Sequence, residues 1–352
     1  MPLITGFSLT FLAGITMGFS LWSIKWARVW KWENFWLVYT IVSLIIVPFV
    51  IAFLMLPHLA LVYASLTPRE AMLPFVLGAF WGFAQLGAGI CVHRLGFAVS
   101  GAVLNGVGAA VGTLVPLIIL HREVLLQKSG LLIFFGMAVT LGGVTLCGWG
   151  GYRREELAKS QGRGAGFSTT ESAMAQTAST HKGYLKSLAI AFGSGVLSAL
   201  LNIALAYSSG IMDKVRAHGG QASWAPFAVW PIALLGASLV NLSYSVYLLF
   251  KNKSWGRFGE KLGEIGNPAL AGIMWMGAIA LYSSATTYLG TLGISIGFAL
   301  FTITMILSGQ LVAVVTGEWR LMQRSIYRSF FLGIGLLVLA VLAIGAANYY
   351  QS

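Results

Sequence analysis

Long apolar runs, each close to 20 residues, alternate with short polar segments along the whole chain. A helix needs about 20 mainly apolar residues to cross the hydrocarbon of a bilayer, and ten runs of this length are present. The polar and apolar alternation that a membrane barrel requires is absent, so the runs are predicted to be helices. They cover residues 5–24, 35–56, 70–92, 97–120, 129–150, 184–207, 225–250, 268–289, 293–316 and 327–348.

One helical hairpin occurs twice, in altered form, at residues 78–123 and 274–320. Each copy has an early tryptophan, polar residues in its first helix, a Leu-Gly turn, a glycine in its second helix and a glutamate at or just past the end. The tryptophan, the Leu-Gly turn, the glycine and the glutamate are Trp81, Leu95, Gly96, Gly112 and Glu123 in the first copy. In the second copy they are Trp275, Leu292, Gly293, Gly309 and Glu318. A repeated hairpin in an apolar chain predicts a transporter built from two halves.

Residues 151–183 divide the chain. This segment is charged at first and then rich in Gly, Ser, Thr, Ala and Gln, which predicts a flexible cytoplasmic linker. It separates a first five-helix repeat, residues 1–150, from a second, residues 184–352. Because five is odd, the second repeat enters the membrane from the opposite side. The predicted fold class is therefore an all-α membrane protein with ten transmembrane helices in two inverted five-helix repeats.

Composition and charge support a multi-pass membrane protein. The chain is 57% hydrophobic and only 9% charged, far from the composition of a soluble domain. The loops after the odd-numbered runs carry 17 of the Lys and Arg residues and the other side carries 5. These loops are therefore predicted to be cytoplasmic, with both termini periplasmic. The net charge of +12 indicates attraction to anionic lipid and does not indicate nucleic acid. The first run lacks a basic leader and is predicted to be a retained span.

The motifs of enzymes and ATP-driven pumps are missing. The sequence has no phosphate-binding loop, no nucleophile elbow and no His and Cys cluster. Cys91 and Cys147 are isolated and are predicted to be neither a metal site nor a disulfide. We therefore expect no enzyme, no cofactor and no metal.

Polar residues inside the apolar runs are the candidates for substrate binding. Gln85 and Asn105 would be costly against lipid, so each is expected either to line a wet cavity or to bond a neighbouring helix. Residues 281–290 place two tyrosines and four hydroxyl residues in a segment that should cross hydrocarbon. Aromatic faces with hydroxyls and amides are typical of a sugar or polyol site, although each hydroxyl can also bond its own helix. The predicted binding residues are Gln85, Asn105, Asn202, Trp275, Tyr282, Ser283 and Gln310, with Trp81 as a stacking wall.

No acidic residue lies at the middle of a run, which leaves few candidates for ion coupling. A few ionisable residues lie close enough to the spans to be coupling candidates, although each can also be explained as an ordinary residue of the membrane interface. They are Glu33, Glu70, Glu123, Glu318, His58, His93 and His121. Glu123 and Glu318 are chosen as the coupling candidates. The proton is the expected coupling ion, and Na⁺ stays open.

Several segments resemble one bacterial family. They are KWENFW at 31–36, IVSLIIVPF at 41–49, GAFWG at 78–82, RLGFAVSGAVLNGVGAAVGTLVPLI at 94–118, Asn202, GIMW at 272–275 and GEW at 317–319. Together they resemble the L-rhamnose-proton symporter family of the drug/metabolite transporter superfamily. The resemblance implies an inner-membrane carrier that takes up a deoxyhexose with a proton. The second hairpin departs most from the family, since residues 293–298 carry no acid and residues 281–290 are richer in hydroxyls. The residues that recognise the substrate of this chain are therefore expected to lie in the second hairpin.

Two other functions stay open at this stage. The chain could be a drug or metabolite exporter, or a facilitator, of the same superfamily. It could also be a non-transporting membrane sensor or scaffold, but residues 151–183 are too short and too polar for a folded output domain. The sequence is silent on oligomeric state.

Overall fold

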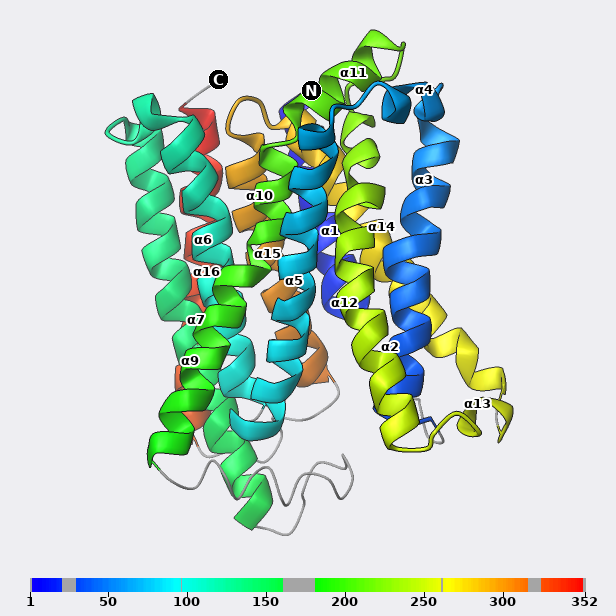
Figure 1. Ribbon diagram of the computed structural model, residues 1–352. Helices are drawn as coiled ribbons and strands as arrows, with labels where there is room; N and C mark the ends of the chain where they lie inside the picture. Colours follow the sequence, from blue (N-terminus) through cyan, green and yellow to red (C-terminus); the bar gives the residue numbers. More distant parts are fainter. Residues whose placement is uncertain are drawn as a thin grey trace. The chain divides into compact units, whose positions relative to one another are not determined.

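The computed structural model describes residues 2–20, 30–95, 97–160, 181–260, 262–315 and 324–350, and this part of the chain is helical without strands (Figure 1). Ten helical segments within it are long and apolar enough to cross a membrane. They are Pro2–Ser20, Trp32–Met55, Pro68–Cys91, Val99–Leu120, Lys128–Arg153, Leu185–Ala217, Ala225–Lys251, Leu262–Tyr288, Gly293–Val312 and Ile326–Asn348. Each overlaps one predicted run, so the all-α class with ten spans is confirmed. The inverted relation of the two halves stays a prediction.

The described chain forms two compact units, each assembled from separate parts of the sequence. Unit 1 comprises residues 1–83 and 200–308, and unit 2 comprises residues 84–199 and 309–352. The linker separates residues 1–150 from residues 184–352 along the chain, whereas each compact unit combines residues from both of these halves. Helices α5 (Pro68–Leu95) and α15 (Gly293–Val315) contribute to both units.

Unit 1 contains the elements on which the candidate site is built. Besides the first part of α5 and most of α15, they are α1 (Pro2–Ser20), α2 (Trp32–Thr40), η2 (Ile41–Ile46), α3 (Val47–Met55), α4 (Leu59–Ala64), α10 (Leu200–Ala206), α11 (Ser209–Ala217), η4 (Ala225–Ala228), α12 (Val229–Lys251), α13 (Arg257–Glu260), η5 (Leu262–Ile265) and α14 (Gly266–Tyr288). Helix α14 packs along α1, and η2 packs against both α12 and α14.

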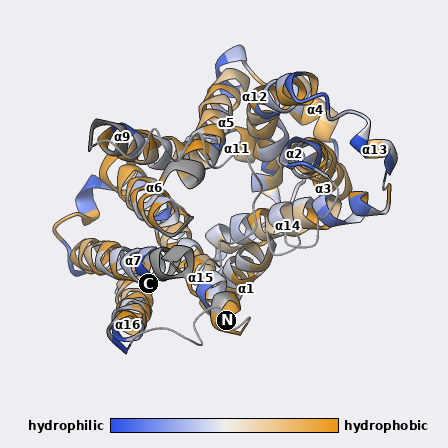
Figure 2. Cartoon of the chain, turned by 90° about the horizontal axis from the view of Figure 1, so that it is seen from below, coloured by the Kyte–Doolittle hydropathy of each residue, from blue (hydrophilic) through white to orange (hydrophobic). Residues whose placement is uncertain are grey.

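Unit 2 is a group of long helices. They are α6 (Phe97–Leu120), α7 (Lys128–Ser160), α9 (His181–Ser198) and α16 (Arg324–Tyr349), with the short η3 (Arg122–Val124). Helices α7 and α16 lie side by side over much of their length (Figures 1 and 2). Helix α7 continues to Ser160 and α9 begins at His181, so the first ten residues of the predicted linker are helical. Residues 161–180 lie outside the described residues.

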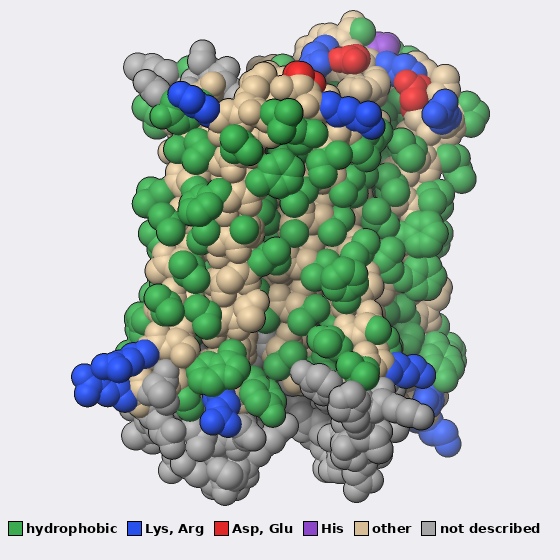
Figure 3. All heavy atoms as spheres, turned by 90° about the vertical axis from the view of Figure 1, so that its left-hand side faces the viewer, with side chains coloured by type: hydrophobic (Ala, Val, Ile, Leu, Met, Phe, Trp, Pro, Cys, Tyr) green, Lys and Arg blue, Asp and Glu red, His purple; other side chains and the backbone are tan. Residues whose placement is uncertain are grey.

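The surface has the distribution of side chains that a bilayer requires. Figure 2 shows that the long helices are apolar around most of their circumference, which is typical of helices in lipid. On the face in Figure 3, hydrophobic side chains fill the middle and Lys and Arg side chains lie towards the ends. The chain is therefore a multi-pass membrane protein.

Local chemistry explains where the helices start and bend. At the start of α5, the Thr67 backbone N–H donates to Glu70 Oε2 (2.8 Å) and the Glu70 N–H donates to Thr67 Oγ1 (3.4 Å). This reciprocal arrangement is a capping box, and Pro68 follows the cap, where its missing N–H costs nothing. Pro48 lies in the second span, at the start of α3. A π-helical turn, η2, lies directly before it, because proline cannot donate to the carbonyl four residues earlier.

Helices α5 and α12 approach each other through glycine. A Cβ atom built on Gly78 would lie 1.8 Å from the Ala233 carbonyl oxygen, and one built on Gly236 would lie 2.0 Å from the Phe75 carbonyl oxygen. Only hydrogen fits at either position. Small residues that let backbones touch are the main way in which helices associate in lipid.

Gly78→Ala should therefore destabilise the protein by about 2 kcal/mol or more, because the backbone of α12 must move to admit a methyl group. Thermal unfolding in detergent measures the effect. Gly89→Ala in the same helix is the matched control, since its Cβ would meet no described atom within 4 Å. Equal melting temperatures for the two variants would contradict the packing explanation.

Candidate functional site

Aromatic side chains gather on one face of α14 within unit 1. The indole rings of Trp81 and Trp275 lie 5.5 Å apart between centroids, and both side chains are buried. The ring of Tyr282 stacks on Phe301 at 5.1 Å and meets Phe298 edge-on at 6.1 Å. Four of these five residues belong to the hydrophobic core of unit 1 and Phe298 packs against it; together they are called the α14 aromatic cluster. It provides flat apolar faces with few polar groups.

The hydroxyl groups predicted from this segment are bonded inside unit 1. Tyr282 Oη donates to the Asn202 side-chain oxygen. Ser283 Oγ donates to the Ile279 carbonyl at 2.6 Å and accepts a hydrogen bond from Trp230 Nε1 at 2.8 Å. Ser283 is fully buried. In this structure these three predicted binding residues are thus occupied by partners in the protein, and a ligand would have to replace or share those bonds.

Trp230 is a residue that the sequence reasoning did not single out. It is 1% exposed, it opens α12, and its indole N–H is the donor that holds Ser283. A buried indole nearly always needs an acceptor. The sequence therefore indicates that a buried Trp230 needs an acceptor, but it does not indicate which hydroxyl group provides it.

The other three predicted binding residues belong to unit 2. Gln85, Asn105 and Gln310 are half-buried on α5, α6 and α15. The Gln85 side-chain oxygen is buried, and it has no hydrogen-bond partner in the described part of the chain. An unpaired amide inside a spanning helix is costly unless water or a ligand reaches it. Unit 2 therefore holds a hydrogen-bonding capacity that the described residues do not use.

The acidic candidates have very different surroundings. Glu123 lies in η3, its side chain is 66% exposed, and an oxygen lies 3.5 Å from His121 Nδ1. Glu318 lies outside the described residues. Glu33, at the start of α2, is 4% exposed and accepts hydrogen bonds from Ser254 Oγ (2.6 Å) and Asn252 Nδ2 (3.1 Å). Among the described residues, no cation forms an ion pair with Glu33.

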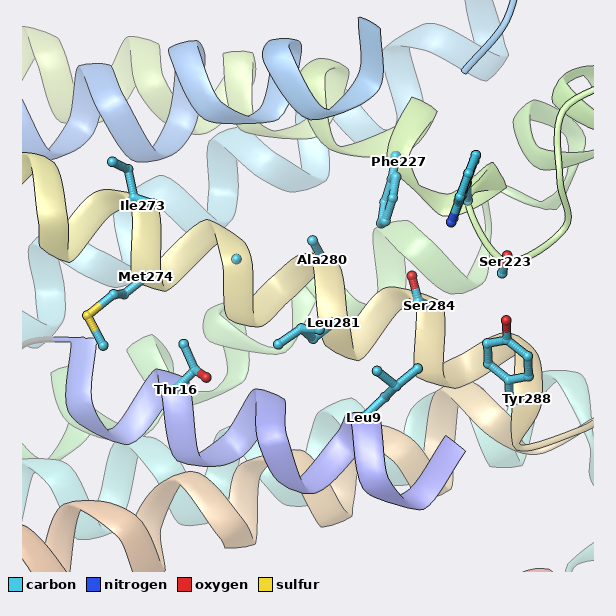
Figure 4. Close-up of a pocket in the computed structure, with 12 residues that line it drawn as sticks. Leu9, Thr16, Ser223, Phe227, Ile273, Met274, Ala280, Leu281, Ser284 and Tyr288 are labelled. Atoms are coloured by element: carbon cyan, nitrogen blue, oxygen red, sulfur yellow. The ribbon is translucent and has the colours of Figure 1, made fainter. Parts of the chain in front are cut away.

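The opposite face of α14 borders an open groove of about 540 Å³ within unit 1 (Figure 4). Its walls come from α1, from the segment around η4 and from the α14 residues that alternate with the aromatic cluster, among them Gly277, Leu281, Ser284 and Tyr288. None of the eight predicted binding residues lines it. Helix α14 thus places Trp275 and Tyr282 in the core of unit 1, and its opposite face borders the groove.

Comparison with known proteins gives one family. The family described as "L-rhamnose-proton symport protein (RhaT)" matches residues 9–348. The L-rhamnose-proton symporter of Mannheimia succiniciproducens is 25% identical over 334 residues, which cover 91% of this chain and 91% of the relative. The protein of that name in Shigella boydii is 25% identical over 335 residues, 92% of each chain. Its counterpart in Yersinia pestis is 23% identical over 330 residues, 91% of each chain.

Ser283→Ala should destabilise unit 1 by about 1–3 kcal/mol, because the buried Trp230 indole loses its acceptor. Ser284→Ala is the matched control, since the neighbouring hydroxyl faces the groove and holds no indole. Thermal unfolding of both variants measures the difference. If Ser284→Ala were as destabilising as Ser283→Ala, the Trp230 bond would not be the cause.

Proposed function

The chain belongs to the L-rhamnose-proton symport protein (RhaT) family, and we propose on this basis that it carries L-rhamnose or a closely related sugar into the cell with a proton, by alternating access. The observation that supports this most strongly is the extent of the match. It begins within the first candidate span and ends at the last residue of the tenth. The site of function is the bacterial inner membrane, and we propose that both termini are periplasmic and residues 151–183 cytoplasmic.

The chemistry of the predicted residues suits a deoxysugar. Such a sugar offers hydroxyl groups on its edge and C–H groups, including a methyl, on its faces. The α14 aromatic cluster supplies flat apolar surfaces for the C–H groups, through Trp81 and Trp275 above all. Gln85, Asn105 and Gln310 in unit 2 remain predicted binding residues, because an amide offers both a donor and an acceptor to a hydroxyl. Asn202, Tyr282 and Ser283 would join by exchanging their internal bonds for bonds to the sugar.

The alternative functions have less support. No observation favours export of a drug or metabolite over uptake of a sugar. A sensor would need a folded output domain, and the described residues outside the ten spans form only short helices and loops.

Transport by the purified chain in proteoliposomes tests the proposal. We expect radiolabelled L-rhamnose to accumulate when the outside is acidic, and a protonophore to abolish the accumulation, because the proton gradient is the driving force. A Na⁺ gradient at equal pH is the control for the ion. Uptake that ignores the pH gradient would remove proton coupling, and failure to transport any 6-deoxyhexose would remove the substrate class.

The coupling group is a separate proposal. Glu123 and Glu318 remain predicted candidates, and Glu33 joins them on structural grounds. Its carboxyl group is buried, and its hydrogen-bond donors are a neutral hydroxyl and a neutral amide. An ionisable group held inside a membrane protein without a cation is a candidate proton carrier. The side chain of Glu123 is 66% exposed, so it is not held inside the protein and is less suited to coupling.

Glu33→Gln should reduce pH-driven accumulation by about tenfold while exchange of labelled for unlabelled sugar continues, because exchange needs no net proton movement. The glutamine oxygen can still accept from Ser254 and Asn252, so the fold should be kept, and thermal unfolding verifies this. Glu123→Gln serves as the matched control at an exposed position. Loss of exchange and accumulation together would indicate a structural role for Glu33, and normal accumulation would exclude it as the coupling group.

A further inference from the structure

The groove on the outer face of α14 has the surroundings of a lipid-facing surface. Ile273, which lines the groove, is 51% exposed, and Leu12 and Leu270, each one helical turn from a lining residue, are 50% and 45% exposed. Apolar residues exposed on membrane-spanning helices face hydrocarbon. The groove is therefore accessible from the bilayer.

Its length corresponds to one leaflet. The groove follows α14 from Ile273 to Tyr288, and at 1.5 Å per residue this is about 22 Å. One leaflet, with its headgroup region, is also about 20–22 Å thick. Gly277 lies in this stretch, and a Cβ atom there would meet no described atom within 4 Å. The absence of a side chain at Gly277 keeps the path along the groove open.

Polarity changes along the groove in the way it does along a lipid. The part nearer the middle of α14 is lined by Ile273, Met274 and Leu281. Thr16 also lines this part, but its hydroxyl donates to the Leu12 carbonyl of its own helix at 2.8 Å. At the other end, Figure 4 places Ser223 close to Tyr288, with Ser284 beside them. The hydroxyl groups of these three residues make no hydrogen bond within the described chain. None of the described residues that line the groove is charged.

We propose that this groove binds one glycerophospholipid, with an acyl chain along the apolar part and its ester and phosphate oxygens accepting from Ser223, Ser284 and Tyr288. Hydroxyl donors fit ester and phosphate oxygens. Because none of the described lining residues is basic, the proposed binding does not depend on an anionic headgroup. A sugar fits poorly, since most of the lining is apolar.

Native mass spectrometry of the delipidated chain, titrated with palmitoyl-oleoyl phosphatidylethanolamine, tests the proposal. The unaltered chain should bind one lipid more tightly than any further lipid. Gly277→Leu places a bulky side chain in the acyl path, and displacing even two methylene groups should weaken that first binding step by about tenfold. Gly335→Leu on α16 is the matched control, because a Cβ there also meets no described atom within 4 Å.

Tyr288→Phe removes one hydroxyl without changing the shape of the groove, and it should weaken the same step by less than Gly277→Leu does. Equal binding by Gly277→Leu and the unaltered chain would overturn the proposal. So would an equal loss in Gly335→Leu, which would mean that the lipid is held by the general surface. Displacement of the lipid by L-rhamnose would also overturn it, because the groove would then belong to the sugar pathway.

Discussion

The backbone contact between α5 and α12 is the constraint on which unit 1 depends. At Gly78 and Gly236 each helix touches the carbonyl groups of the other, and no side chain larger than hydrogen fits. In lipid there is little hydrophobic gain from bringing two helices together, so this close contact has to come from packing. The contact holds Trp81, one turn further along α5, and Trp230, in the first turn of α12, in place for their partners on α14.

Helix α14 shows how one helix serves two environments. Residues such as Trp275, Tyr282 and Ser283 point into unit 1, where the hydroxyls of Tyr282 and Ser283 are hydrogen-bonded and the rings of Trp275 and Tyr282 pack against other aromatic rings. Positions between them, such as Gly277 and Ser284, point to the groove. A hydroxyl-rich segment in a membrane can therefore be explained partly by internal bonding and partly by contact with a lipid, and each hydroxyl must be assigned separately.

The polar groups that remain without a partner are as informative as those that are bonded. Gln85 has a buried amide oxygen with no hydrogen-bond partner among the described residues, whereas Ser283 has both a donor and an acceptor. The cost of an unpaired buried group must be met by a ligand or by water in some state of the protein. Glu33 lies between these cases, because it accepts hydrogen bonds but pairs with no cation among the described residues.

The sequence by itself determined the class of the protein and the positions of its spans. Helices in hydrocarbon must satisfy every backbone group within themselves, so their lengths and ends can be read from apolar runs, as α6 and α15 illustrate. The family likewise follows from residues spread along the whole chain. Tertiary structure alone decided which way the residues of each helix point. Tyr282 and Ser284 are two positions apart in the same hydroxyl-rich segment, yet one faces the protein interior and the other the groove, because that choice depends on which helices surround α14.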